Sequence, residues 1–140
     1  MTPDSIISLI SEINHKAKKQ IVRELKKNDV EGISASHGDI LANLYSRGPM
    51  SITKLAGFIS KEKNTTTVLI DKLERNGYLT RTLCDEDKRK TIIKLTEKGL
   101  SLNPVFRKIS RQLIDTTFMN FSEEEKEQVM RLLLRIKQNL

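Results

Sequence analysis

The sequence predicts a mostly α-helical chain that carries one small β-hairpin. Residues 78–83 and 91–96 are rich in β-branched and aromatic side chains, and the charged segment 85–90 joins them, as in a hairpin. Two short helical segments joined by a tight turn come directly before this hairpin, and amphipathic segments lie at both ends of the chain. A pair of helices followed by a hairpin, or wing, is the winged helix-turn-helix arrangement.

The N-terminal segment is predicted to form one long amphipathic helix. Pro3 suits the first turn of a helix, and the apolar periodicity then continues to about Asn28. The helix is longer than a compact domain of this size needs, so we expect part of it to pack against another chain. Its apolar positions recur at spacings of four and three: Ile6, Ile10, Ile13, Ala17, Ile21 and Leu25.

Serine residues mark the start of the next two helices. Ser36 is the expected cap of a helix that ends at the Gly48-Pro49 pair, because glycine followed by proline is a strong break. Ser51 is the expected cap of a short helix that ends near Ile59. The apolar side chains of these two helices are expected to face the core: Ile40, Leu41, Leu44, Ile52, Leu55, Ala56 and Ile59.

A third helix follows a turn at residues 60 and 61. It is predicted over about 62–76, and Gly77 lies just beyond its end, where helices favour glycine. Together with the preceding short helix it completes the predicted helix-turn-helix. Its core-facing positions are Thr66, Leu69, Ile70 and Leu73.

After the hairpin the chain is predicted to be helical to its end. Asn103-Pro104 interrupts this region, either as a kink or as a fresh helix start with Asn103 as its cap. Ser122 and Glu125 have the spacing of a capping box, which predicts the start of the last helix. The apolar residues of that helix form a wide stripe: Val129, Met130, Leu133, Leu134, Ile136 and Leu140.

So wide an apolar surface on a terminal helix is unusual for a monomer. We therefore expect the first and last helices to build a dimer interface. The alternative is that the two ends of one chain pack against each other.

The charge of the chain favours a polyanionic partner. The formal net charge of the 140 residues is +7, and residues 51–99 hold eleven Lys and Arg against seven Asp and Glu, so that +4 lies in this part. Nucleic acid is the first candidate for a small basic protein, and an ordinary basic surface is the alternative.

Cys84 is the only cysteine, so an intrachain disulfide is excluded, in keeping with a reducing cytoplasm. No apolar run approaches the roughly 18 residues of a membrane span, and the N-terminus lacks the pattern of a signal peptide. We expect a cytoplasmic protein without a membrane partner.

Four short segments in fixed order resemble the multiple-antibiotic-resistance regulator (MarR) family. They are Ile52-Thr53-Lys54-Leu55-Ala56, the run from Thr67 to Arg81, Asp87-Lys88-Arg89, and Leu95-Thr96-Glu97-Lys98-Gly99. The resemblance covers about residues 51–99.

The resemblance implies one domain over 1–140, in which 36–99 bind DNA and 1–30 with 100–140 form a helical dimerisation region. It also implies a homodimer that binds a pseudo-palindromic operator in double-stranded DNA, usually as a repressor, and that a small anionic or phenolic ligand can release. Two alternatives stay open: an activator or anti-silencer of the same fold, and a winged-helix module that binds protein.

The first turn of the third helix is the expected reader of base edges, because a helix N-terminus fits the major groove. Threonine methyls suit the thymine methyl, Asn64 can pair with adenine, and Lys63 is expected on phosphate. Val68 departs from the family, which often has arginine or a polar residue there, and offers only apolar contact. The expected DNA-contacting residues of this helix are Lys63, Asn64, Thr65 and Thr67.

In the wing, Asp87 and Arg89 match the aspartate and arginine of the family. The resemblance implies that Asp87 braces Arg89, which enters the minor groove, while Lys88 and Lys90 take the flanking phosphates. A solvated surface pair is the alternative. Contacts that position the protein on the DNA backbone are expected from Ser51, Thr53, Lys54 and Arg75.

The remaining reactive residues suggest no chemistry. His15 and His37 are far apart in the sequence and make a poor metal set with one cysteine. No nucleophile elbow or phosphate loop occurs, so we expect no enzyme, no cofactor and no metal. Cys84 is expected to be structural filler, with a redox switch beside the wing as the alternative. Residues that would bind an effector are not identified.

Overall fold

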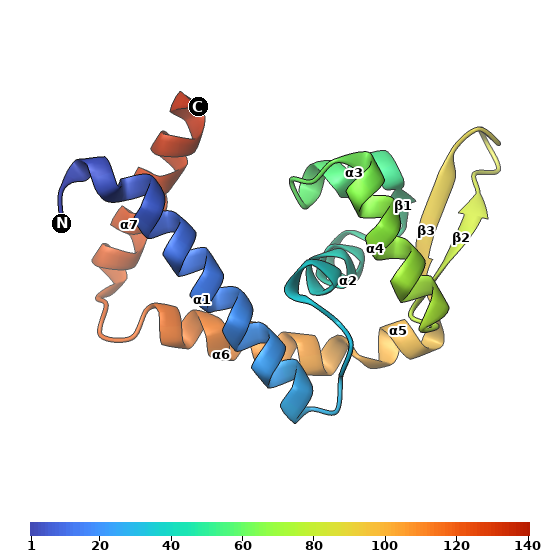
Figure 1. Cartoon of the computed structure of the whole chain (residues 1–140), viewed down its shortest axis with the longest axis horizontal. Helices are drawn as coiled ribbons and strands as arrows, with labels where there is room; N and C mark the ends of the chain where they lie inside the picture. The colour runs from blue at the N-terminus through green and yellow to red at the C-terminus, as the bar shows by residue number, and fades with distance from the viewer.

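A computed structural model describes all 140 residues, and it confirms the mostly helical fold with a small sheet (Figure 1). A 3₁₀ turn at Pro3–Ser5 leads into the first helix. None of the helices is both long and apolar enough to cross a bilayer. The helices are α1 (Ile6–Lys27), α2 (Ala35–Arg47), α3 (Ile52–Phe58), α4 (Lys63–Arg75), α5 (Glu97–Ser101), α6 (Asn103–Thr117) and α7 (Glu123–Asn139).

The predicted hairpin is confirmed and belongs to a three-stranded antiparallel sheet. Strand β2 (Leu79–Leu83) pairs with β3 (Thr91–Leu95), and the outer edge of β3 pairs with the two-residue strand β1 (Met50–Ser51). Strand β1 was not predicted, because two residues are too few to show an alternating pattern. It ties the start of α3 to the hairpin.

The hydrophobic core fills the space between the three short helices and this sheet. Leu25 at the end of α1 and Ile109 of α6 also enter it, so the long helices are anchored to the winged part at one end. The core residues without solvent exposure are Leu25, Ile40, Leu41, Leu55, Ile70, Leu73 and Ile93. Their positions confirm the predicted inner faces of α2, α3 and α4.

The start of α2 differs from the prediction. Ser34, not Ser36, is the cap, and His37 completes a capping box: the backbone N–H of Ser34 donates to Nδ1 of His37 over 3.0 Å, and the backbone N–H of His37 donates to Oγ of Ser34. The usual capping box has glutamate or glutamine three residues after serine, so the sequence did not predict a box that uses histidine. Ser36 lies inside the first turn.

This capping box predicts a pH dependence of folding. Burial, followed by the nearby charge of Lys72, lowers the pKa of His37, so the imidazole is neutral in the folded chain. Its contribution is complete above the pKa of an unfolded histidine, about 6.5, and is lost as pH falls through the lower folded pKa. We expect the free energy of unfolding, measured in urea at pH 7.5 and 5.5, to fall more for the wild type than for His37→Gln.

Glutamine can close the same box without titrating, so His37→Gln keeps the cap and removes only the ionisable group. An equal loss of stability on acidification in the two proteins would contradict this role of His37.

Asn103-Pro104 starts a fresh helix rather than a kink, but Asn103 is not its cap. Leu102 ends α5 and caps α6 with helical backbone angles, and Pro104 occupies the first turn. The Ser122 capping box of α7 is confirmed, with Glu125 as its partner.

The corner between the hairpin and α5 is tightly packed. Thr96 caps α5 by accepting from the backbone N–H of Gly99, and its hydroxyl donates to the carbonyl of Gly77. The Tyr45 hydroxyl donates to the carbonyl of Gly99, and burial raises the pKa of Tyr45 to about 12, so it remains a donor at neutral pH. The Leu95–Gly99 segment that resembles the family is therefore a structural joint.

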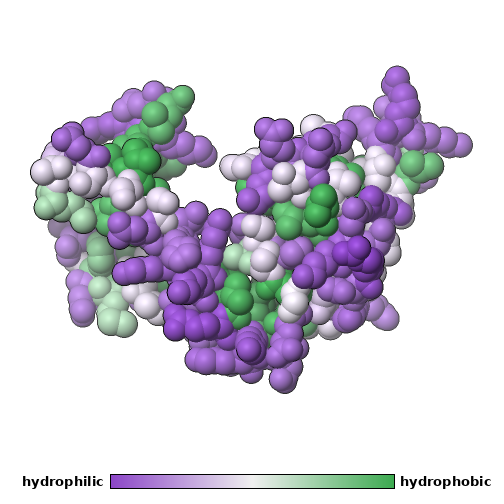
Figure 2. All heavy atoms as spheres, in the orientation of Figure 1, coloured by the Kyte–Doolittle hydropathy of each residue, from purple (hydrophilic) through white to green (hydrophobic).

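Helices α6 and α7 and most of α1 extend away from the winged part and form an arm (Figure 1). No residue of α7 is buried, and apolar side chains are visible on the surface of the arm (Figure 2). Its exposed apolar residues include Ile7, Ile13, Ile114, Met130, Leu133 and Leu134. The expected wide apolar surface of the terminal helix is present.

Candidate nucleic-acid interface

Helix α4 follows α3 after a tight turn, as predicted. Ser60 adopts a left-handed backbone conformation with φ of 54°, and the backbone N–H of Lys61 bonds the carbonyl of Ala56. Glu62 is the N-cap of α4 but gives no side-chain cap. The first turn of α4 is thus open to solvent, and in Figure 1 it lies on the same upper side of the molecule as the tip of the hairpin.

The two faces of α4 are as the 3.6-residue period predicts. Thr66 is fully buried beside Ile70, whereas Val68 on the opposite face has 67% of its surface exposed. Asn64 and Thr65 are also exposed. Helix α4 therefore presents a short polar turn followed by one apolar side chain.

The threonine hydroxyls are partly committed to the helix itself. The Thr66 hydroxyl donates to the carbonyl of Glu62, and the Thr67 hydroxyl donates to the carbonyl of Lys63, each over 2.9 Å. Threonine commonly makes this bond in helices. Thr67 consequently offers a methyl group and a hydroxyl acceptor to a partner.

The wing tip is built around one ion pair. The carboxylate of Asp87 accepts from the backbone N–H and from Nε of Arg89, over 3.0 and 3.1 Å. These contacts hold the pKa of Asp87 below its ordinary value, the side-chain bond contributing more than the backbone bond. The Arg89 side chain is nonetheless 89% exposed. The predicted brace is present as a contact, and it holds an arginine that points outward.

The other sequence-predicted residues lie around this surface. Ser51 accepts from the backbone N–H of Lys54 over 3.2 Å and so caps α3, as expected. Lys54 is exposed at the start of α3, and Arg75 is exposed at the end of α4. Twelve residues of helix, about 18 Å, separate Arg75 from Lys63, so the two side chains cannot contact the same base pair. Thr53, Lys88 and Lys90 are exposed as well.

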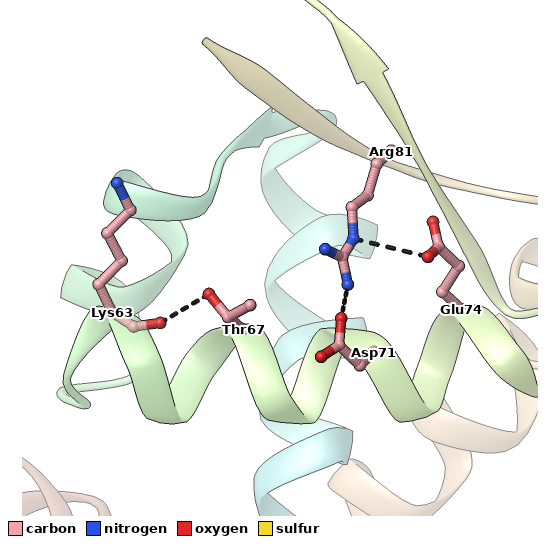
Figure 3. Close-up of polar contacts among 5 residues, drawn as sticks. All are labelled: Lys63, Thr67, Asp71, Glu74 and Arg81. Carbon is pink, nitrogen blue, oxygen red and sulfur yellow. Dashed lines mark hydrogen bonds and ion pairs between the residues drawn. The ribbon is translucent and has the colours of Figure 1, made fainter.

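Sequence reasoning missed a second ion-pair cluster, between the wing and α4 (Figure 3). Arg81 of β2 donates through Nη2 to Asp71, and its Nε lies 3.6 Å from the carboxylate of Glu74. Asp71 and Glu74 are three residues apart and so lie on one side of the helix. The available signal was this spacing together with a cation on the strand that follows.

No group of three or more His, Cys, Asp and Glu side chains could hold a metal ion. Cys84 is half-buried where β2 meets the loop, and its backbone N–H bonds the carbonyl of Lys90. The arrangement places a helix N-terminus and a basic hairpin tip on one side of the molecule. The fold and this surface define the class of winged helix-turn-helix, DNA-binding transcriptional regulators.

Comparison with known proteins places the chain within that class. A model of the MarR family matches residues 33–91. The HTH-type transcriptional regulator YkoM of Bacillus subtilis is 31% identical over 112 residues, which are 80% of this chain and 71% of YkoM. The chain belongs to the MarR family.

Two further likenesses bear on the surface. The HTH-type transcriptional repressor YetL of Bacillus subtilis is 36% identical over 104 residues, 73% of this chain and 62% of YetL. A crystal structure of an S. aureus MepR–DNA complex superposes with a TM-score of 0.85 and 26% identity, covering 100% of this chain and 99% of MepR.

Proposed function

We propose that this chain is a sequence-specific repressor that binds a pseudo-palindromic operator as a homodimer. The observation that carries the proposal is the exposed Arg89, held by Asp87 at the tip of a hairpin that lies on the same side as the open first turn of α4. The name of YetL supports repression, and the MepR complex supports DNA as the partner. The chain acts by binding alone, in the cytoplasm.

In this proposal α4 enters the major groove and the wing enters the adjacent minor groove. Base edges are read by the exposed first turn of α4, and Val68 adds an apolar contact suited to a thymine methyl. Arg89 inserts where a narrow A·T-rich minor groove concentrates negative potential. The contacts are divided as follows: Asn64, Thr65 and Thr67 on base edges in the major groove, and Lys63, Ser51, Thr53, Lys54, Arg75, Lys88 and Lys90 on phosphates.

Dimerisation is assigned to residues 1–30 and 100–140, and DNA binding to 36–99. The support is the arm, in which α7 has no fully buried residue and exposes Met130, Leu133 and Leu134. A contiguous apolar surface of this kind marks an interaction site. A two-fold dimer would place two α4 helices about 34 Å apart, which is one turn of DNA.

Fluorescence anisotropy with DNA from upstream of the chain's own gene tests the proposal. Selection from a random duplex pool supplies a second probe for the case in which the target lies elsewhere. We expect tight binding that survives excess unrelated duplex and weakens steeply between 50 and 200 mM salt, because phosphate contacts release counterions. If no duplex is enriched from the pool, the protein-interaction module becomes the better interpretation.

We also propose that an anionic aromatic ligand relieves repression. A groove of about 950 Å³ between α1 and the start of α2 has the size of a small-molecule site. Five basic side chains and no carboxylate line it: His15, Lys16, Lys18, Lys19 and Arg23. Benzoate and its hydroxylated analogues are suitable probes. These probes should weaken the affinity of the wild type and of Lys26→Gln for the operator. The affinity of a Lys19→Gln/Arg23→Gln double variant should change much less.

A further inference from the structure

Two carboxylates lie on the flank of α4 that faces the wing. Asp71 and Glu74 share this side of the helix with Thr67 and Lys63, and their side chains are 46% and 42% exposed (Figure 3). Neither is paired within α4 itself; both face a single cation on the next strand, Arg81. Acidic side chains are unexpected on α4, the helix proposed to bind DNA, in a protein with a net charge of +7.

In the proposed complex, a strand of the DNA backbone would lie close to Asp71 and Glu74. A helix in the major groove and a wing in the neighbouring minor groove have one sugar-phosphate strand between them. The side of α4 that Arg81 contacts therefore faces that strand in the proposed complex. Unneutralised carboxylates there would repel its phosphates, since like charges brought together at an interface are strongly unfavourable.

Arg81 reaches from β2 to this side of α4. Its guanidinium contacts Asp71 through Nη2 and lies 3.6 Å from Glu74 through Nε, which is buried and has no hydrogen-bond partner. The Arg81 side chain is only 28% exposed, in contrast to the outward-pointing Arg89 at 89%. Arg81 thus faces the helix rather than a partner.

We propose that Arg81 is a positioning residue for DNA binding: it neutralises Asp71 and Glu74, so that the phosphate strand can pass between the wing and α4. The inference rests on the proposed function. A purely structural ion pair is the competing account. Partly exposed pairs contribute little to stability, so Arg81 should affect binding far more than folding.

Removal and restoration of the charges separate these accounts. The probe is the duplex selected by the wild type from the random pool. We expect Arg81→Met to bind it about tenfold more weakly, because two carboxylates then face the DNA. The triple variant Arg81→Met/Asp71→Asn/Glu74→Gln lacks all three charges and should recover to within about threefold of the wild type. The defect of Arg81→Met should shrink at high salt, where such repulsion is screened.

Lys94→Met is the matched control, because Lys94 is an exposed cation on the neighbouring strand β3. It should cost less affinity than Arg81→Met and should gain nothing from the two carboxylate substitutions. Circular dichroism and the thermal midpoint should be close to wild type for every variant.

The inference is overturned if Arg81→Met binds as well as Lys94→Met, or if the triple variant stays as weak as Arg81→Met. A folding defect in Arg81→Met that the triple variant shares also overturns it in favour of the structural account. If the wild type selects no duplex, the proposed function fails and this inference fails with it. If the wild type selects a duplex that Arg81→Met binds equally well, only the inference fails.

Discussion

Arg89→Ala is expected to weaken binding to the selected duplex by about 1–3 kcal/mol, or roughly fivefold to 150-fold. Arg89 is the most exposed member of the wing-tip ion pair, and Asp87 limits its conformations before it meets DNA. An arginine held in advance loses less side-chain freedom on insertion, so more of its attraction to a minor groove is realised as affinity. The measurement is anisotropy at matched salt with the wild type alongside.

Lys88→Ala is the matched control for this experiment. Lys88 neighbours Arg89 on the same loop and has no bond to Asp87, so its loss should weaken all duplexes about equally. Arg89→Ala should also reduce the preference for A·T pairs at the wing position. Equal affinity of Arg89→Ala and the wild type for the selected duplex would refute insertion of the wing.

Gly99→Ala is expected to destabilise the fold by about 2 kcal/mol or more, because overpacking of a rigid site is costly. A Cβ at Gly99 would collide with the carbonyl oxygen of Tyr78 and lie 3.1 Å from Leu95 Cδ2. The carbonyl of Tyr78 is held in turn by the backbone N–H of Thr96, so it cannot move aside freely. Thermal and urea unfolding measure the loss.

Gly57→Ala serves as the comparison, because a Cβ at Gly57 in α3 meets nothing within 4 Å. Alanine there should be neutral or slightly stabilising, since it restricts the unfolded chain. If Gly99→Ala unfolds at the same temperature as Gly57→Ala, the corner between the hairpin and α5 is less rigid than the geometry indicates.

The periodic parts of the chain were predictable from sequence. Apolar spacing placed the helices and the buried face of α4, and two runs of β-prone residues joined by a charged loop placed β2 and β3. Boundaries were less secure where two serines competed: Ser36 was expected as a cap, but His37 supplied Ser34 with a partner. Strand β1 forms because it pairs with the free edge of β3, and the local sequence pattern carries no signal of that pairing.

In the candidate interface, only contacts between residues that are close in the sequence could be predicted. Asp87 and Arg89 are two residues apart, so their contact follows from the loop itself. Arg81 lies ten residues from Asp71, and the two meet because β2 folds back along α4. A prediction of that contact requires the angle between helix and hairpin, which tertiary packing determines and sequence spacing does not.

The exposure of helix α7 implies that the stability of the arm depends on protein concentration. A helix with no buried residue adds little to the folding of its own chain, so its order depends on what covers it. If a second copy provides that cover, the stability of the arm follows mass action and rises with the logarithm of protein concentration. Dilution would then dissociate the dimer before the winged part of either subunit unfolds. The copy number of the regulator would therefore set the fraction of chains that can bind both halves of an operator.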